Sequence, residues 1–398
     1  MDPESTTVLE RTGIRIAIAG GGTGGHISPA VAVIEELRSR LPVEAIWVGS
    51  RDGYERQAAE GLGIPFHAVR TGKLRRYVSP QTVTDSVRVP WGMAQARSIL
   101  KHWQPDVVFS SGGFVSVPSV IAARSLGFPS LTHEQTAYIG LATRINARFC
   151  QTIALSFDRS ASFLPRHKAN VVVTGNPVRR VVLHGDATAA RRHFGLPDDL
   201  PVVYVTGGAQ GSRFLNRVVF DSLSGLSGDV AVIHQIGPRE AHPDIDEGRR
   251  RREALPPEVQ PRYVPVERTT AEIGHLYAAT SLVVGRSGAG TVNELAALSI
   301  PSILIPLPGA EEQRQNALYL VERGTATLIP QSDLTPETLT AAVLEVIRNP
   351  SALERMSSTC HDARPIRAAA KLADELLVLV GRHRDSLLEC RINRVVEG

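Results

Sequence analysis

The stretch that decides the fold is a glycine-rich turn, GGGTGGHISP at positions 20–29, which follows the apolar run Ile14–Ala19. It precedes an amphipathic segment, Ala30–Leu41, so the order predicts a buried strand, a tight loop and a helix. Glycines let backbone N–H groups approach an anionic ligand, and a helix N-terminus favours negative charge. The turn ends in His26, a side chain suited to proton transfer near neutral pH. The residues alone leave His26 open as a proton carrier or as a loop histidine with a structural partner.

The residues after the turn indicate where the helix begins. Ser28 is expected to cap the helix and Pro29 to occupy its first turn. The apolar residues at helical spacing are Ile27, Val31, Ile34 and Leu37. Two common nucleotide-binding motifs are absent, because no Gly-Lys-Ser/Thr follows the glycines and the second predicted strand ends in Ser50 instead of an acidic residue. The turn is therefore neither a P-loop nor a good dinucleotide fingerprint.

Length and composition predict a soluble protein of two domains. The chain has 398 residues, 42% hydrophobic and 21% charged, with a net charge of +4. No apolar run approaches the roughly 20 residues of a membrane span, and the first dozen residues do not resemble a signal peptide. Three widely separated cysteines, Cys150, Cys360 and Cys390, follow no metal-ligand spacing and indicate a reducing compartment.

Short apolar runs alternate with helical patterns along the chain, which is typical of buried parallel strands in an α/β fold. The predicted strands are 15–19, 45–48, 107–109, 130–132, 152–155 and 171–173, then 202–205, 231–234, 262–264, 282–284, 302–305 and 326–329. The second set opens as the first does, with a strand, a glycine turn (Thr206–Ser212) and a helix. We therefore expect two Rossmann-like, doubly wound halves, with ligands at the carboxyl ends of both sheets.

Two later segments carry polar residues at helix starts. Glu294 follows Gly285–Thr291, whose residues are small except for Arg286. A carboxylate there gains about 0.3–1 kcal/mol from the helix dipole or binds two ribose hydroxyls. Gln313 and Asn316 lie on one face of the helix after Pro308-Gly309. Each amide is either a simple cap or a reader of sugar hydroxyls.

The motif segments 20–29, 206–212, 285–295 and 306–317, with 111–118, 133–135 and 175–179 between them, resemble the family-28 glycosyltransferases of the GT-B fold. The resemblance extends over residues 15–329. It implies an α/β architecture of two Rossmann-like doubly wound domains facing a central cleft. The expected parts are an acceptor- and membrane-facing domain (13–180), a UDP-GlcNAc-binding domain (181–364) and a C-terminal helix (365–381) that returns to the first domain.

The resemblance also implies an activity. A family-28 enzyme of this kind moves N-acetylglucosamine from UDP-GlcNAc to the muramyl 4-hydroxyl of undecaprenyl-diphospho-MurNAc-pentapeptide, with inversion and without a bound metal or cofactor. The expected location is the cytoplasmic face of the cell membrane, as a peripheral protein. A cell-wall synthesis complex is a further expected partner.

Site roles follow residue by residue from the same resemblance. His26 is the candidate catalytic base and Glu134 its rival. The expected acceptor-binding residues are His133, Gln135 and Thr136. The expected donor-binding residues are Thr23, Gly24, Gly25, Arg179 (uracil), Gln210, Gly211, Ser212, Ser287, Gly288 (diphosphate), Glu294 (ribose), Gln313 and Asn316 (GlcNAc). The sequence departs from the family at Thr136, where asparagine is usual, at Ala209, usually serine, and at Phe114, often tyrosine.

Basic and aromatic residues gather in one region of the first half. They lie in Lys73–Val78, Arg88–Met93 and Arg97–Trp103, which include two of the three tryptophans. Such residues suit an anionic lipid surface. The alternative is a helix packed on its own domain with a solvated basic face. The run Arg249–Arg252 is expected to be solvated, and no nucleic-acid-binding module is visible.

Three other functions remain open at this point. One is a glycosyltransferase for a different acceptor, which Thr136 and Ala209 favour. Another is an isomerase resembling UDP-GlcNAc 2-epimerase, which would lack the acceptor-side motif. The third is a non-catalytic scaffold, although no donor motif is degraded.

Overall fold

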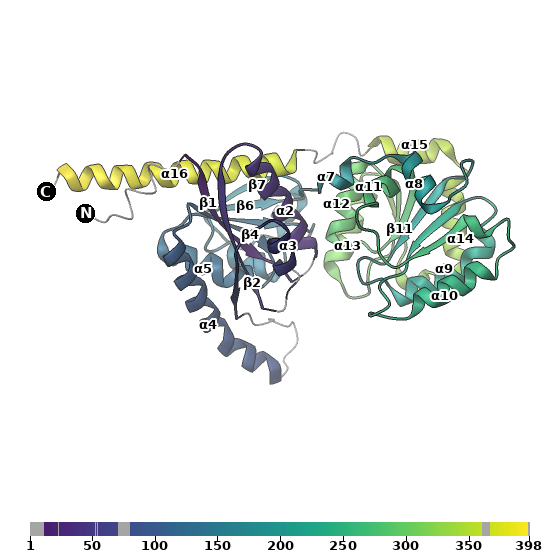
Figure 1. Cartoon of the computed structure of the whole chain (residues 1–398), viewed down its shortest axis with the longest axis horizontal. Helices are drawn as coiled ribbons and strands as arrows, with labels where there is room; N and C mark the ends of the chain where they lie inside the picture. The colour runs from purple at the N-terminus through teal and green to yellow at the C-terminus, as the bar shows by residue number, and fades with distance from the viewer. Residues whose placement is uncertain are drawn as a thin grey trace. The chain divides into compact units, whose positions relative to one another are not determined.

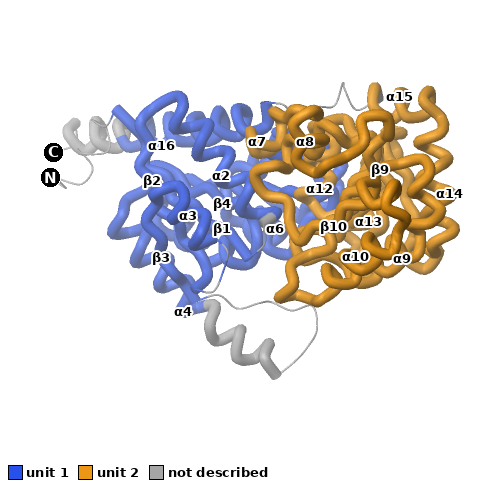
Figure 2. Tube along the Cα trace, turned by 45° about the vertical axis from the view of Figure 1, so that its right-hand side comes forward, with its two compact units in different colours: residues 1–177, 366–398 blue, residues 178–365 orange. Residues whose placement is uncertain are grey.

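The computed structural model describes residues 12–22, 24–51, 53, 55–70, 80–359 and 367–396, with the side chains of 80–89, 359 and 388–396 left aside. The chain divides into two compact units, shown in Figure 2. Unit 1 comprises Met1–Pro177 and Ile366–Gly398, and unit 2 comprises Val178–Pro365. Residues 178–180 thus belong to unit 2, although the sequence assigned them to the first domain.

Unit 1 is a parallel sheet with helices between its strands (Figure 1). Its elements are β1 (Ile14–Gly20), α2 (Gly24–Arg38), β2 (Val43–Ser50), α3 (Glu55–Gly61), β3 (Phe66–Val69), α4 (Pro80–Trp103), β4 (Val107–Gly112), α5 (Ser116–Leu126), β5 (Ser130–Glu134), α6 (Leu141–Asn146), β6 (Thr152–Leu155), η1 (Asp158–Phe163), β7 (Asn170–Val173) and α16 (Ala368–Val396). The strand order is β3-β2-β1-β4-β5-β6-β7. Strand order therefore reverses between β1 and β4, as in other doubly wound sheets.

The side chains of β1 alternate between the two faces of the sheet. Ile16 and Ile18 pack in the cluster that α2 and α16 cover, whereas Ala17 and Ala19 pack in the cluster that α4 and α5 cover. A strand that is apolar on both faces must be buried on both, which is why β1 reads as a continuous apolar run. The expected α/β fold with doubly wound parallel sheets is confirmed.

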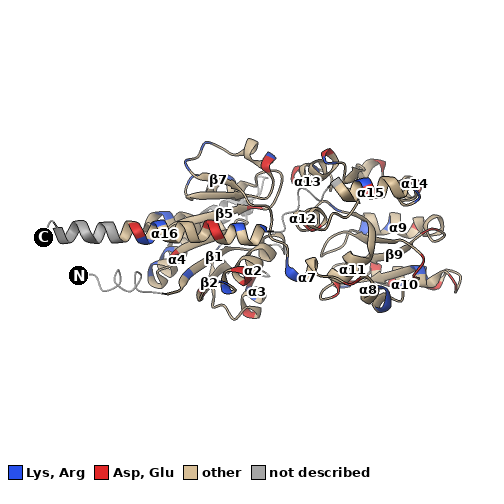
Figure 3. Ribbon diagram, turned by 90° about the horizontal axis from the view of Figure 1, so that it is seen from above, with Lys and Arg blue, Asp and Glu red and all other residues tan. Residues whose placement is uncertain are grey.

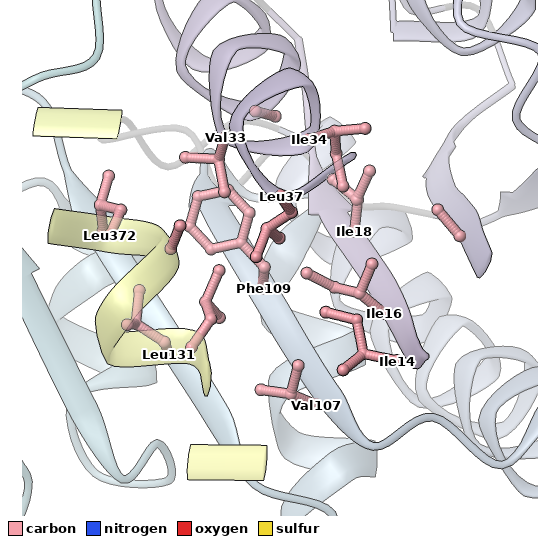
Figure 4. Close-up of a cluster of buried hydrophobic side chains, with 14 of the residues drawn as sticks. Ile14, Ile16, Ile18, Val33, Ile34, Leu37, Val107, Phe109, Leu131 and Leu372 are labelled. Atoms are coloured by element: carbon pink, nitrogen blue, oxygen red, sulfur yellow. The ribbon is translucent and has the colours of Figure 1, made fainter. Parts of the chain in front are cut away.

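Helix α16 is part of the core of unit 1 although it lies at the far end of the chain. Leu372 and Leu376 are fully buried in the same cluster as Phe109 on β4, and Figure 4 shows Leu372 beside Leu131 and Phe109. Each such side chain stabilises the fold by about 1.5–3 kcal/mol relative to an exposed one. Arg384 Nη2 adds a hydrogen bond to the buried Asp106 carboxylate (3.1 Å).

Two expectations for unit 1 are wrong in detail. Helix α2 begins at Gly24, so Ser28 and Pro29 lie inside it instead of capping it. The physical reason is that Ile27 and Ile34 are buried in the same hydrophobic cluster. Because helical geometry places Ile27 on the core-facing side, the helix begins before Ser28. Each predicted strand overlaps an observed one, but β3 has no predicted counterpart. It is a short, partly exposed edge strand and lacks the apolar run that marks the others.

Unit 2 repeats this architecture with six strands in the order β10-β9-β8-β11-β12-β13. Its elements are α7 (Arg180–Leu183), α8 (Ala187–Phe194), β8 (Val202–Thr206), α9 (Arg213–Leu226), β9 (Ala231–Gln235), α10 (Asp244–Glu253), η2 (Gln260–Arg262), β10 (Tyr263–Val266), α11 (Ile273–Ala279), β11 (Thr280–Gly285), α12 (Ala289–Leu298), β12 (Ser302–Leu304), α13 (Glu311–Glu322), β13 (Ala326–Leu328), η3 (Gln331–Asp333), α14 (Pro336–Ile347) and α15 (Pro350–Thr359). The order reverses between β8 and β11.

Candidate active site

The candidate residues gather where the strand order of each sheet reverses. In unit 1 the glycine turn follows β1, and Gly112-Gly113 ends the neighbouring β4. In unit 2 the turn 207–212 follows β8, and 286–288 follows the neighbouring β11. Ligands of open α/β sheets bind at this crevice, outside the carboxyl ends of the strands. The motifs far apart in sequence are thus brought together in pairs within each unit.

A buried carboxylate shapes the glycine turn of unit 1. Glu55 is fully buried, and its Oε2 accepts from the backbone N–H of Gly22 (3.1 Å). Its Oε1 accepts from the N–H (2.7 Å) and hydroxyl (2.6 Å) of Ser50. A β-carbon at Gly21 would lie 2.2 Å from this carboxyl, so the turn needs glycine there. The sequence analysis missed Glu55; an acidic residue five positions after the end of β2 was the available signal.

His26 lies in the first turn of α2 and is half-buried. Its Nδ1 is 2.7 Å from Gln135 Oε1 and 3.1 Å from the carbonyl oxygen of Ser111. The imidazole also packs on Gly112 and Gly113, whose φ angles of +92° and +78° favour glycine. A β-carbon at Gly112 would lie 2.8 Å from His26 Nδ1. The two glycines after β4 therefore make room for the histidine of the other turn.

Gln135 and His133 lie behind His26 and are buried, with exposed fractions of 1% and 0%. The Nε2 of Gln135 contacts the Ser111 carbonyl (2.6 Å) and His133 Nδ1 (3.1 Å). His133 Nε2 lies 3.1 Å from the carbonyl oxygen of Gly175. Burial lowers the pKa of His133 to about 4, so its imidazole is neutral at pH 7.

Glu134, the rival base, already accepts three hydrogen bonds. Its Oε1 accepts from the Thr136 N–H (3.1 Å) and hydroxyl (2.7 Å), and its Oε2 accepts from the Gly140 N–H (3.0 Å). The carboxylate is 4% exposed. These bonds order the turn between β5 and α6, and they also occupy the Thr136 side chain. The arrangement favours His26 over Glu134 as the group that takes a proton.

In unit 2, a cation lies behind the turn of Gln210, Gly211 and Ser212. Arg286 is only 7% exposed, and its Nη2 donates to Ser212 Oγ (2.9 Å) and to Gln331 Oε1 (2.7 Å). Ser212 also caps α9 by accepting from a backbone N–H. Because its oxygen accepts twice, the Ser212 hydroxyl proton is available to an anion. Arg286 was missed by the sequence analysis; a lone cation directly after an apolar strand was its signal.

Glu294 lies on α12 and is linked to a buried tyrosine. Its Oε2 accepts from the Tyr277 hydroxyl (2.9 Å), which is its one hydrogen bond among the residues that the structure describes. Burial raises the pKa of the Glu294 carboxyl, and the charge of Arg179 opposes that rise. Carboxylate Oε1 is thus left as an acceptor for a further donor such as a hydroxyl.

The remaining candidates of unit 2 differ in how many of their polar groups already have hydrogen-bond partners within the protein. Ser287 donates its hydroxyl to the Gln313 carbonyl (2.8 Å), and the fully buried Asn316 donates to the Ser287 carbonyl (3.0 Å). These two hydrogen bonds connect α13 to the segment just before α12, whose N-cap residue is Gly288. Gln313 accepts from the Leu307 N–H through Oε1 (3.0 Å), which leaves its NH₂ group for a ligand.

Three further candidates belong to unit 1. Gly24 and Gly25 are the first residues of α2 and present backbone N–H groups at its N-terminus. Thr23 lies outside the described residues. Within the described ranges, no group of three or more His, Cys, Asp or Glu side chains could hold a metal ion.

The basic aromatic region divides between surface and core. Trp91 on α4 is 62% exposed, and Arg97 and Lys101 are exposed on the same helix. Trp103 instead packs against the core, with Arg15 4.3 Å from its ring centre. Lys73–Val78 lies outside the described residues, as do the side chains of Arg88 and Val89. In the part of the chain that the structure describes, no helix is long and apolar enough to cross a membrane.

The arginine run of α10 is largely exposed. Figure 3 colours the Lys and Arg positions of the chain blue and the Asp and Glu positions red. Arg250 and Arg251 pair with Glu247, at 2.7 Å and 2.6 Å, and Arg249 pairs with Glu267 at 3.8 Å. These exposed pairs satisfy the charges locally, as the sequence predicted for this run.

Comparison with known proteins gives matches over most of the chain. The glycosyltransferase family 28 N-terminal domain matches residues 16–155, and the C-terminal domain of that family matches residues 202–375. A relative from Treponema denticola, named UDP-N-acetylglucosamine--N-acetylmuramyl-(pentapeptide) pyrophosphoryl-undecaprenol N-acetylglucosamine transferase, is 36% identical over 92% of this chain and 95% of its own length.

Solved structures show the same fold. MurG of Acinetobacter baumannii superposes with a TM-score of 0.70 at 23% identity, covering 92% of this chain and 99% of that one. A putative UDP-N-acetylglucosamine 2-epimerase from Listeria monocytogenes superposes with a TM-score of 0.62 at 15% identity, covering 90% and 95%. Because a transferase and an epimerase both match, the fold by itself does not discriminate between the two reactions.

Proposed function

Because the chain belongs to glycosyltransferase family 28, we propose that it moves N-acetylglucosamine from UDP-GlcNAc to the muramyl 4-hydroxyl of undecaprenyl-diphospho-MurNAc-pentapeptide, a step of peptidoglycan synthesis. The observation that carries the proposal is the 36% identity, over 92% of the chain, to a transferase named for this donor and acceptor. The epimerase likeness is confined to the fold. The site chemistry in each unit supports the same reaction.

His26 is the proposed base. Its Nδ1 takes both of its hydrogen bonds to described residues, so Nε2 is the nitrogen left for the acceptor hydroxyl. As the 4-hydroxyl oxygen bonds to the anomeric carbon, its proton moves to Nε2. The bond from that carbon to the β-phosphate oxygen breaks, and its electron pair leaves with UDP. Attack opposite the leaving group inverts the anomeric centre.

Unit 2 supplies the proposed donor groups. Glu294 Oε1 is an acceptor for a ribose hydroxyl, and the free NH₂ of Gln313 is a donor for a GlcNAc hydroxyl. The negative charge that develops on the diphosphate faces the N-termini of α9 and α12, the Ser212 hydroxyl and the Arg286 guanidinium behind it. We propose that these groups neutralise the leaving UDP without a metal ion.

The test is transfer of radiolabelled GlcNAc from UDP-GlcNAc to undecaprenyl-diphospho-MurNAc-pentapeptide (lipid I) in detergent, with EDTA present. A labelled lipid product supports the proposal, including its metal independence and the tolerance of Thr136 and Ala209. Product that appears only without EDTA contradicts the metal-free part. Donor binding without lipid product points to another acceptor, and conversion of UDP-GlcNAc to its 2-epimer without release of UDP supports the isomerase instead.

We also propose that unit 1 contacts the cytoplasmic face of the membrane as a peripheral protein, since the acceptor is a lipid. Trp91, Arg97 and Lys101 are the exposed residues that support this. Each cation near an anionic surface contributes about 1 kcal/mol. The test is sedimentation with anionic and with neutral vesicles. Trp91→Ala and Arg97→Gln should each weaken binding to anionic vesicles, whereas Arg250→Gln on α10 should not.

A further inference from the structure

The hydrogen bonds behind His26 have directions that the chemistry of their partners dictates. Gln135 Nε2 lies within 3.2 Å of two carbonyl oxygens, those of Ser111 and His133. A carbonyl oxygen only accepts, so the nitrogen of the amide must face these two groups. The amide oxygen then faces His26 Nδ1 at 2.7 Å. The orientation of the Gln135 amide is therefore determined by its surroundings.

The same reasoning determines the tautomer of His26. Its Nδ1 has two neighbours, the amide oxygen of Gln135 (2.7 Å) and the carbonyl oxygen of Ser111 (3.1 Å), and both are acceptors. A nitrogen held by two acceptors must carry the proton. The neutral imidazole therefore has its lone pair on Nε2. An isolated imidazole favours the opposite tautomer, so these contacts reverse its intrinsic preference.

His133 extends this chain into the core. Its Nδ1 accepts from Gln135 Nε2 (3.1 Å), so its Nε2 carries the proton and donates to the Gly175 carbonyl (3.1 Å). Burial keeps this imidazole neutral at pH 7, with a pKa of about 4. A neutral His133 presents an acceptor to the Gln135 amide, whereas a protonated one would present a second donor. The amide is thus held from both sides.

We infer that Gln135 and His133 are positioning residues, which hold His26 in the Nδ1–H tautomer so that its Nε2 can act as the base. The inference rests on the proposed function for the role of His26 in transfer, but the tautomer itself is a property of the protein alone. It differs from the expectation that both residues bind the acceptor, because their side chains are buried and their polar atoms are already bonded within unit 1.

The experiment measures the tautomer directly, in the full chain labelled with ¹⁵N-histidine, at alkaline pH where imidazoles are neutral. Comparison with His26→Gln assigns the two ring-nitrogen signals of His26. We expect Nδ1–H in the unmodified protein and a shift of the population toward Nε2–H in Gln135→Leu. In the same variant kcat should fall about 10- to 100-fold through loss of the correct tautomer and ring orientation, with KM for UDP-GlcNAc unchanged.

The matched control is Gln151→Leu. Gln151 also accepts through its amide oxygen, from the Ser130 N–H (2.7 Å) in unit 1, and its described hydrogen bonds do not involve His26. This variant should alter neither the tautomer nor kcat. Gln135→Met has a side chain of similar length without an amide and should shift the tautomer in the same direction, which keeps the inference testable if Gln135→Leu does not fold.

Two results would overturn the inference. One is an unmodified protein whose His26 carries its proton on Nε2; the other is a Gln135→Leu variant that folds and keeps the Nδ1–H tautomer. Failure of the proposed function looks different. If the protein had no transfer activity but the His26 tautomer still depended on Gln135, the positioning role of Gln135 would stand and the proposed transfer reaction would be wrong.

Discussion

The two glycine turns have the same local plan and opposite charges behind them. In unit 1 the buried carboxylate of Glu55 holds the turn, and a histidine follows. In unit 2 the buried guanidinium of Arg286 supports the turn by donating to Ser212 Oγ, which leaves the Ser212 hydroxyl proton for another acceptor. A cation stabilises an anionic ligand and an anion does not. The comparison therefore associates diphosphate binding with unit 2 and proton transfer with unit 1.

The largest expected effect comes from removing the base of unit 1. His26→Ala should lower kcat by about 10²–10⁴-fold, the usual contribution of a general base. The dissociation constant for UDP-GlcNAc, measured by calorimetry, should stay within a factor of about two, because His26 is not one of the expected donor-binding residues and most of those belong to unit 2. If His26→Ala lost donor binding as severely as turnover, the division of roles between the two turns would be wrong.

The next effect tests the cation of unit 2. Arg286→Leu removes the buried positive charge behind Ser212 and the hydrogen bond that holds the Ser212 side chain. Because that charge would attract the diphosphate, the affinity for UDP should fall roughly 10- to 100-fold, which corresponds to about 1.5–3 kcal/mol. The affinity for uridine, which has no phosphate, should change far less. Arg314→Leu, which removes an exposed arginine paired with Glu311, is the control. An equal loss for UDP and uridine would mean that Arg286 supports the fold and not the phosphate site.

A smaller effect is expected when the buried anion of unit 1 is neutralised. Glu55→Gln replaces one acceptor oxygen by an NH₂ group, which faces a backbone N–H and cannot accept from it. An unsatisfied buried group costs about 1–3 kcal/mol. The free energy of unfolding, followed in urea by tryptophan fluorescence, should decrease by that amount. All three tryptophans, Trp47, Trp91 and Trp103, belong to unit 1 and report on it. Unchanged stability would show that Glu55 is not what holds the glycine turn.

The smallest effect concerns pH. Burial lowers the pKa of His133 to about 4, so between pH 6.5 and 4 the unfolded chain binds a proton that the folded chain does not. Stability from this group is therefore complete above pH 6.5 and is lost as pH falls, by roughly 1.4 kcal/mol at pH 5.5. His133→Asn should flatten this dependence by that amount in the same urea titration. An identical slope in both proteins would mean that folded His133 takes up a proton near its ordinary pKa.

Local patterns predicted a large part of this molecule. Every strand but β3 was readable as an apolar run, and the glycine turns marked the points where strand order reverses. These features depend on neighbours within a few residues of one another. The site residues were also locatable, since motif segments at strand ends must lie at the ligand-binding edge of a parallel sheet. Strand β3 was missed because it has only four residues, Phe66–Val69, of which only Val69 is buried and His67 interrupts the apolar run.

What each site residue does depended on partners far away in the chain. Asn316 and Gln313 had the same expected role in sequence, yet the Asn316 amide donates to the Ser287 carbonyl between two helices, whereas the NH₂ group of Gln313 remains for a ligand. Glu55 and Arg286 became visible as supports of the two turns only through their burial and contacts.

By itself, then, the sequence determined the two doubly wound halves, the positions of both glycine turns and the family to which the chain belongs. The tertiary structure alone decided which nitrogen of His26 is free, because the amide of Gln135 that orients it comes from 109 residues further along the chain. Side-chain periodicity encodes which face of an element is buried, but a hydrogen bond requires atoms within about 3 Å at a defined angle. Only the packed fold sets such distances between elements.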